Sequence, residues 1–215
     1  MPTRNAFLLR FIVTAATIAS CGMAGSAPAQ TIIDEWTSVQ VPPPPALKSV
    51  AIDTKTTALL LFDFNAQTCN PQRRPRCIAS IPRVQGLLAT ARASGVPVAF
   101  TLGGGGKPPD IAKELTPNAG EPIFSSGVDK FVNTDLEKFL KDKGITTVVV
   151  VGNAAHGAVL YTASGAAMRG FKVIIPVDGV SSDTAYSEQY VAWHLVNAPV
   201  ISPAMTLTKI ADVKF

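Results

Sequence analysis

The chain has 215 residues, of which 47% are hydrophobic and 16% charged, so it fits one folded domain with a packed core and not a disordered protein. Its formal net charge is +4, but the basic residues are scattered, apart from the group Arg73, Arg74 and Arg76. A nucleic-acid site needs a basic stripe for the phosphates and aromatic side chains for the bases, so we predict no nucleic-acid partner.

Residues 1–29 read as a signal peptide, with two arginines at the start, an apolar run over 11–20 and the small residues Ala27-Pro28-Ala29 at the end. This pattern predicts a periplasmic or secreted protein. An alternative is a lipid anchor at Cys21, because Ile18-Ala19-Ser20-Cys21 resembles a bacterial lipobox. Membrane attachment is expected only in that case, since the apolar run is far shorter than the ~20 residues that span a bilayer.

The rest of the chain divides into a proline-rich arm over 30–50 and one domain over 51–215. The run Pro42–Pro45 predicts an extended arm, because it cannot form a helix or a central strand. Strands and helices then alternate, which predicts an α/β fold: a three-layer, doubly wound parallel sheet with helices on both faces. The expected strands are 57–64, 96–102, 121–124, 146–151 and 172–177, and the expected helices are 80–94, 133–143, 156–169 and 187–197.

Two cysteines, Cys69 and Cys77, flank a short polar stretch directly after the first strand. An exported protein meets an oxidising environment, so we predict a disulfide between them that pins a loop beside the strand. Two alternatives stay open, namely a pair of free thiols and a catalytic role for Cys69.

A tight turn joins the strand over 146–151 to the following helix, where unpaired backbone N–H groups can hold an anion. The sequence Gly152-Asn-Ala-Ala-His-Gly-Ala-Val-Leu-Tyr-Thr-Ala163 resembles the nucleophile turn of the isochorismatase-like (cysteine hydrolase) superfamily. Most members have a cysteine at the position of Ala158. The thiol is absent here, and the pair Ala155-His156 is more similar to the true isochorismatase branch, which also works without that cysteine. The resemblance implies substrate binding by Ala154, Ala155, His156 and Gly157.

Asp63 ends the first strand, within the sequence LLLFDF, where ligand-binding groups gather in parallel sheets. Burial favours the protonated carboxyl, which suits a general acid. An aspartate also stands at this place in isochorismatase-like hydrolases, so Asp63 is our first catalytic candidate. The alternative is an aspartate that only caps the next turn.

The superfamily also has a lysine ahead of a helix, in a KxxYSAF-like stretch. Aligning Phe131 with the family phenylalanine places Ser125, or Ser126 after a one-residue shift, at the lysine position. Lys130 lies nearby and can reach inward together with Phe131 to contact substrate, but we expect a surface lysine at the start of a helix.

No metal or other cofactor is predicted, because the chain has two histidines and a glycine run, 103–106, where the nicotinamidase branch has a D-x-H motif. His156 is expected to orient the turn by a hydrogen bond, with substrate contact as the alternative.

The resemblance implies a hydrolase that acts on a small, carboxylated metabolite and works without a cysteine nucleophile, with Asp63 as the general acid. A homo-oligomer is implied by the resemblance alone. The alternative function is a non-catalytic small-molecule-binding protein on a hydrolase scaffold. Arg73, Arg74 and Arg76 can bind a substrate carboxylate if the loop between the cysteines folds over the pocket, although solvated surface arginines are the default expectation.

Overall fold

The computed structural model describes residues 31–215, so the predicted signal peptide over 1–29 and the lipidation site at Cys21 lie outside the described residues. The chain forms two units, one up to Val41 and one from Pro42 to Phe215. The described part of the first unit, residues 31–41, contains one helical turn, α1 (Ile32–Glu35). Residues 42–49 have no helix or strand, and the boundary at residue 51 stays a prediction. None of the helices within residues 31–215 has both the length and the apolar character of a membrane span.

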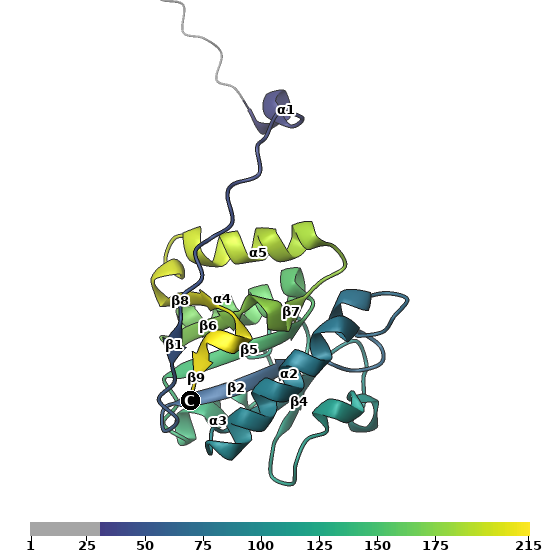
Figure 1. Ribbon diagram of the computed structural model, residues 1–215, viewed down its shortest axis with the longest axis vertical. Helices are drawn as coiled ribbons and strands as arrows, with labels where there is room; N and C mark the ends of the chain where they lie inside the picture. Colours follow the sequence, from purple (N-terminus) through teal and green to yellow (C-terminus); the bar gives the residue numbers. More distant parts are fainter. Residues whose placement is uncertain (1–30) are drawn as a thin grey trace, which may run out of the picture. The chain divides into compact units, whose positions relative to one another are not determined.

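The second unit is built on a parallel sheet with the strand order β4-β3-β2-β5-β6-β8 (Figure 1). The chain runs outward from β2 to β4 and then returns with β5 beside β2, which gives the predicted doubly wound topology. The strands are β2 (Thr57–Phe62), β3 (Val98–Leu102), β4 (Ile123–Ser125), β5 (Thr147–Asn153), β6 (Lys172–Pro176) and β8 (Met205–Thr208), and the short β7 (Val180–Ser181) pairs with the end of β5.

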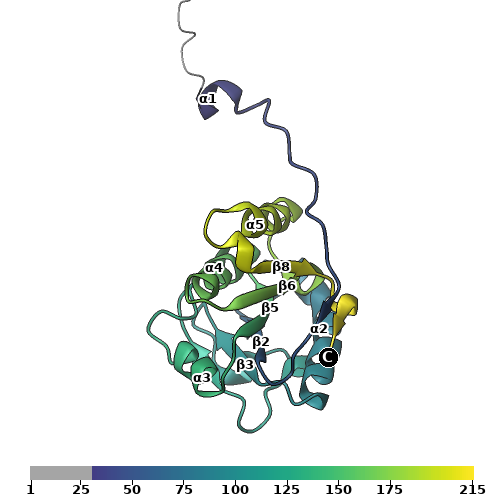
Figure 2. The ribbon, with the colours of Figure 1, turned by 90° about the vertical axis from the view of Figure 1, so that its left-hand side faces the viewer.

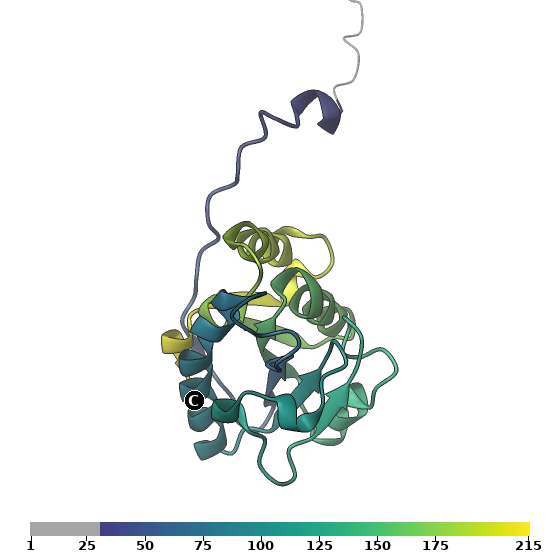
Figure 3. The ribbon, with the colours of Figure 1, turned by 90° about the vertical axis from the view of Figure 1, so that its right-hand side faces the viewer.

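Helices cover both faces of this sheet, which confirms the predicted three layers. Figure 2 shows α2 (Pro75–Ala93) on one face and α3 (Leu136–Asp142), α4 (Leu160–Met168) and α5 (Ala185–Asn197) on the other, and Figure 3 shows the same arrangement from the opposite side. The alternation of β2 side chains explains this, because Leu59 and Leu61 pack in the core under α2 while Leu60 and Phe62 pack in the core on the other side.

Some elements differ from the sequence expectation. The helix expected over 80–94 begins earlier, at Pro75, because proline is well tolerated in the first helical turn. Strand β8 is absent from the sequence expectation, because it has only four residues. A separate two-stranded sheet pairs β1 (Val50–Ala51) with β9 (Val213–Lys214). Short 3-10 turns complete the chain at Pro108–Asp110, Lys113–Leu115, Val177–Gly179, Ser202–Ala204 and Ile210–Asp212.

The predicted disulfide joins Cys69 to Cys77, with 5.5 Å between their Cα atoms. Both residues are buried in the core under α2. The bond ties the loop after β2 to the first turn of α2. It also excludes the two alternatives, free thiols and a catalytic Cys69, because a disulfide sulfur is not a thiolate nucleophile.

Replacing both cysteines, as Cys69→Ser/Cys77→Ser, should lower the free energy of unfolding by about 2 kcal/mol, because the small closed loop restricts the unfolded chain only modestly. Urea unfolding followed by circular dichroism measures the change. Under a reducing agent, wild type and double variant should then unfold at similar urea concentrations. A difference that persisted under reduction would assign the loss to the serines and not to the bond.

Candidate active site

The site lies where β2 and β5 end side by side in the middle of the sheet. Phe62 pairs with Gly152, so the following residues, Asp63 and Asn153, meet at the same edge. Ligands bind at this kind of position in open parallel sheets, where the strand order reverses. Gly152 is required there, because its φ is 137° and a Cβ atom would lie 2.3 Å from the backbone oxygen of Phe62.

Asp63 forms an ion pair with Lys130 at this edge. The Lys130 Nζ donates to Asp63 Oδ1 at 2.9 Å and to Oδ2 at 2.7 Å, and also to the backbone oxygen of Gly127 at 2.9 Å. The Thr101 hydroxyl, on β3, donates to Asp63 Oδ1 at 2.8 Å. Lys130 is 0% exposed and Asp63 6% exposed, so the pair is almost dry. The neighbouring ammonium offsets the cost of burying a carboxylate, and the sequence argument from burial alone is therefore incomplete.

The interpretation of Lys130 as a surface lysine at a helix start is wrong. α3 begins only at Leu136, and Lys130 lies in an irregular turn before it. The turn is held by the backbone N–H of Lys130, which donates to Thr162 Oγ1 at 3.1 Å, and the side chain is thereby directed under Asp63. Ser125, which the alignment placed at the lysine position, is exposed at the end of β4 and lies outside the cavity wall.

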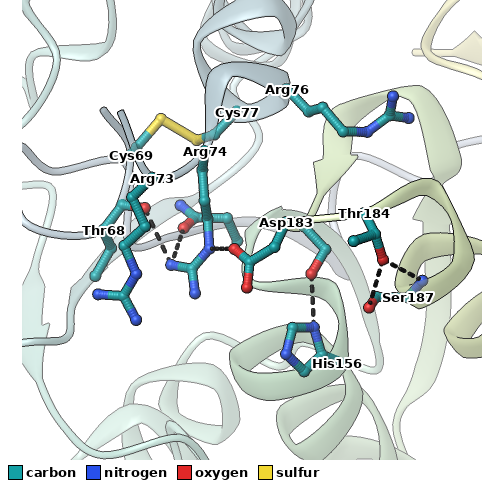
Figure 4. Close-up of polar contacts among 12 residues, drawn as sticks. Thr68, Cys69, Arg73, Arg74, Arg76, Cys77, His156, Asp183, Thr184 and Ser187 are labelled. Carbon is teal, nitrogen blue, oxygen red and sulfur yellow. Dashed lines mark hydrogen bonds and ion pairs between the residues drawn. A yellow bond between two sulfur atoms is a disulfide. The ribbon is translucent and has the colours of Figure 1, made fainter. Parts of the chain in front are cut away.

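A second group of polar side chains holds the backbone around Asp63. The Asn153 amide donates to the Asp63 backbone oxygen at 2.7 Å, and the Thr68 hydroxyl donates to the same oxygen. Arg74 in turn donates to Asn153 Oδ1 at 3.1 Å and to the Thr68 backbone oxygen at 3.0 Å. Its Nε lies 2.6 Å from Asp183 Oδ1 (Figure 4). The disulfide loop is therefore connected to Asp63 through buried hydrogen bonds.

Of these network residues, Thr68, Asn153 and Asp183 are not among the candidates from the sequence. Asn153 is the last residue of the buried strand β5, and a polar side chain at that place is the signal that could have identified it. The default expectation of a solvated surface arginine is wrong for Arg74, which is buried against Asp183, 109 residues away in the chain. The neighbouring Arg76 pairs with Glu188 at 2.5 Å, and this carboxylate raises the pKa of Arg76 above its ordinary value.

Above Asp63 lies a cavity of about 580 Å³. The turn after β5 forms one wall of it, through Ala154, His156, Gly157 and Ala158, and Tyr161 of α4 continues that wall. The other walls come from Thr68, Arg73, Arg74, Gly103, Gly104, Ser126, Gly127, Val128 and Asn153. The cavity is large enough for a small metabolite and shaped by side chains of mixed polarity.

The turn after β5 has an unusual backbone. The peptide bond between Asn153 and Ala154 is cis, and residues Ala155–Val159 form one wide helical turn before α4. The N–H of Gly157 donates to the Ala154 oxygen at 3.0 Å, so this amide is already used and is not free to hold an anion. Ala158, at the position of the family cysteine, is 4% exposed and presents only a methyl group to the cavity.

The other residues predicted to bind substrate occupy different places. His156 lines the cavity and its Nδ1 lies 2.6 Å from the Ser182 hydroxyl, so one ring nitrogen makes the expected orienting bond (Figure 4). Ala155 is buried and lies outside the cavity wall. Phe131 is also outside it, because its ring stacks on Phe171 with 6.2 Å between centroids and lies under the Arg169 guanidinium. The side-chain contacts of Phe131 are therefore structural.

The end of β3 passes close over the acid. A Cβ atom on Gly103 would lie 2.6 Å from Asp63 Oδ2, and one on Gly106 would lie 2.8 Å from the Asn65 side chain. These glycines therefore make room for polar side chains of the protein itself. Within residues 31–215, no three His, Cys, Asp or Glu side chains gather closely enough to hold a metal ion.

Comparisons with known proteins agree on one family. Residues 57–205 match the profile of the isochorismatase domain family. The chain is 31% identical over 141 residues to a secreted isochorismatase effector of Verticillium dahliae, a match that covers 59% of this chain and 73% of that protein. It is 30% identical over 138 residues to an N-carbamoylsarcosine amidase of Arthrobacter, covering 51% of this chain and 52% of the amidase.

Solved structures give the same fold. An isochorismatase-like hydrolase from Alkaliphilus metalliredigens has a TM-score of 0.65 at 25% identity, and the match covers 74% of this chain and 94% of that one. An isochorismatase family protein from Desulfovibrio vulgaris has a TM-score of 0.66 at 21% identity, with 73% and 95% covered.

Replacing Lys130 with Met should lower the free energy of unfolding by about 3 kcal/mol, because the buried Asp63 carboxyl then loses the ammonium that contacts both of its oxygens. The matched control is Lys138→Met, which removes an exposed lysine paired with Asp142 and should cost less than about 0.5 kcal/mol. Urea unfolding measures both variants.

The double variant Asp63→Asn/Lys130→Met completes a thermodynamic cycle. Its loss in free energy of unfolding should be smaller than the sum of the two single losses by about 1 to 3 kcal/mol, because neither variant side chain carries a charge. Simple additivity of the two losses would contradict a direct Asp63–Lys130 interaction.

Proposed function

Because the chain belongs to the isochorismatase family of hydrolases, we propose that it hydrolyses a small, carboxylated metabolite in the cavity beside Asp63. The observation that supports this most directly is the Asp63 carboxylate itself, which lines the cavity while Lys130 and Thr101 fix it from behind. An acidic group held in one orientation at a cavity wall is suited to proton transfer.

The absence of a thiol limits the reaction. Amide hydrolysis in a cysteine hydrolase needs a thiolate that attacks the carbonyl carbon, and the methyl group of Ala158 supplies none. Both cysteines of residues 31–215 are joined in a disulfide, so no other thiolate replaces it within that range. We therefore propose that the bond cleaved is an enol ether, whose hydrolysis needs an acid and water but no protein nucleophile.

In the proposed reaction the Asp63 carboxylate first takes up a proton from solvent, and its O–H bond then breaks as this proton is transferred to the terminal carbon of the enol ether, which forms an oxocarbenium ion. Water adds to this ion and its released proton returns to the Asp63 carboxylate, which restores the acid. The resulting hemiketal breaks into an alcohol and a ketone. Lys130 is a positioning residue in this scheme. It does not line the cavity, but its ammonium donates to both Asp63 oxygens and stabilises the carboxylate that remains after the transfer.

Export is part of the same proposal. The relative from Verticillium dahliae is named as a secreted protein, and the buried disulfide of this chain suits an oxidising compartment. A signal peptide over residues 1–29 would take the chain there, with removal after Ala29 or lipidation at Cys21 as the two routes.

Asp63→Asn should reduce turnover by at least about 100-fold, because an amide cannot donate a proton in place of the acid. The assay offers the purified protein isochorismate, other enol ethers and a panel of small amides, and mass spectrometry identifies the products. The matched control is Asp142→Asn, an exposed aspartate on α3, which should keep the wild-type rate.

The outcomes separate the two functions. Enol-ether cleavage that depends on Asp63 supports the hydrolase, whereas amide cleavage by the wild type would show that the proposed bond type is wrong. If the wild type turns over no compound but still binds members of the panel in a thermal-shift screen, the chain is a binding protein on a hydrolase scaffold.

The mature N-terminus distinguishes the two export routes. After cleavage behind Ala29, the intact mass should equal that of a chain that begins at Gln30. Lipidation would instead leave Cys21 as the first residue, with acyl chains attached. Mass spectrometry of protein recovered outside the cytoplasm provides the measurement. Uncleaved protein that stays in the cytoplasm would contradict export.

A further inference from the structure

Arg73 differs from every other arginine in residues 31–215. Five of the six arginines there have a carboxylate partner, and the pairs are Arg74–Asp183, Arg76–Glu188, Arg83–Asp178, Arg92–Glu121 and Arg169–Glu137. The Arg73 guanidinium makes no hydrogen bond or ion pair with any residue of this described part. It instead forms part of the wall of the cavity that Asp63 lines.

The other cations at this cavity are already used. Lys130 contacts Asp63 from behind, and Arg74 is bound by Asp183 and by Asn153 Oδ1. Arg73 is therefore the one arginine or lysine of the cavity wall whose charged group has no protein acceptor among the residues described. A guanidinium presents a planar pair of donors that matches the two oxygens of a carboxylate.

The loop that carries Arg73 is fixed at several points. The backbone N–H of Arg73 donates to Asn70 Oδ1 at 2.9 Å, and that of Arg74 donates to the Asn70 oxygen at 2.8 Å. The disulfide between Cys69 and Cys77 closes the loop around them. Figure 4 shows the Arg73 and Arg74 side chains extending from this loop in the same direction. The backbone at Arg73 is therefore held in place before any ligand binds, which lowers the entropic cost of binding.

We propose that Arg73 binds a carboxylate of the substrate at the cavity wall and that the Cys69–Cys77 disulfide holds it there. This inference rests on the proposed function for the identity of the reacting site, and it adds the residue that selects carboxylated ligands. The substrate then lies with its anionic group on Arg73 and its reacting group toward Asp63.

The test uses a pair of stable ligands that differ in one charge. 2-Phenoxypropanoate carries a carboxylate, 2-phenoxypropanamide is its neutral twin, and neither contains an enol ether that the proposed reaction can cleave. Isothermal titration calorimetry measures both dissociation constants. The wild type should bind the carboxylate more tightly than the amide.

Arg73→Gln should raise the dissociation constant for the carboxylate by about 10- to 100-fold and leave that for the amide unchanged. Arg73→Lys should bind the carboxylate with a dissociation constant between those of the wild type and Arg73→Gln, because lysine keeps the charge without the paired donors. The matched control, Arg83→Gln, removes an arginine of α2 that pairs with Asp178 outside the cavity, and it should change neither constant.

Each other result overturns the proposal. Equal binding of the two ligands by the wild type excludes a carboxylate site, and equal weakening of both by Arg73→Gln assigns Arg73 a structural role. A Cys69→Ser/Cys77→Ser variant should lose part of the preference for the carboxylate, and a fully retained preference would remove the disulfide from the proposal. Because only binding is measured, these outcomes do not depend on whether the protein shows turnover.

Discussion

The ion pair between Asp63 and Lys130 is the contact on which the site depends. It joins the end of the central strand β2 to a turn that lies 67 residues further along the chain. A charge in so dry a place is stable only with a partner, so the pair constrains both segments to one arrangement. Thr101 on β3 and Asn153 on β5 then hold the same aspartate from the two neighbouring strands. The Asp63 side chain therefore both links neighbouring segments of the fold and lines the cavity of the candidate site.

The sequence contained enough to predict the fold and the position of Asp63 at the end of a central strand, and the reason is local. Buried parallel strands are recognisable as apolar runs, and Asp63 is conspicuous because it ends one of them. Lys130 is not recognisable in this way. It lies in an irregular turn with no periodicity, and a lysine before a helix is usually solvated, so its burial follows only from the tertiary structure.

The same distinction holds for the loop between the cysteines. The disulfide was predictable because both cysteines flank a short stretch in a chain whose first 29 residues resemble a signal peptide. The different roles of the adjacent arginines were not predictable, since they depend on which distant carboxylate each one reaches. Arg74 meets Asp183 and becomes part of the support of Asp63, while Arg73 remains directed to the cavity. Two residues adjacent in sequence can therefore have different roles in one site, one at the cavity wall and one in the hydrogen-bond network behind it.

Alanine at position 158 also affects how the protein responds to oxidants. A thiolate nucleophile is readily converted to sulfenic and then to sulfinic acid, and a cysteine hydrolase loses activity as this proceeds. Residues 31–215 contain no free thiol, because Cys69 and Cys77 are already joined. The cavity wall, with Asp63 and the methyl group of Ala158, therefore presents no sulfur to an oxidant. Peroxide concentrations that inactivate thiol-dependent relatives should therefore leave this cavity chemically intact.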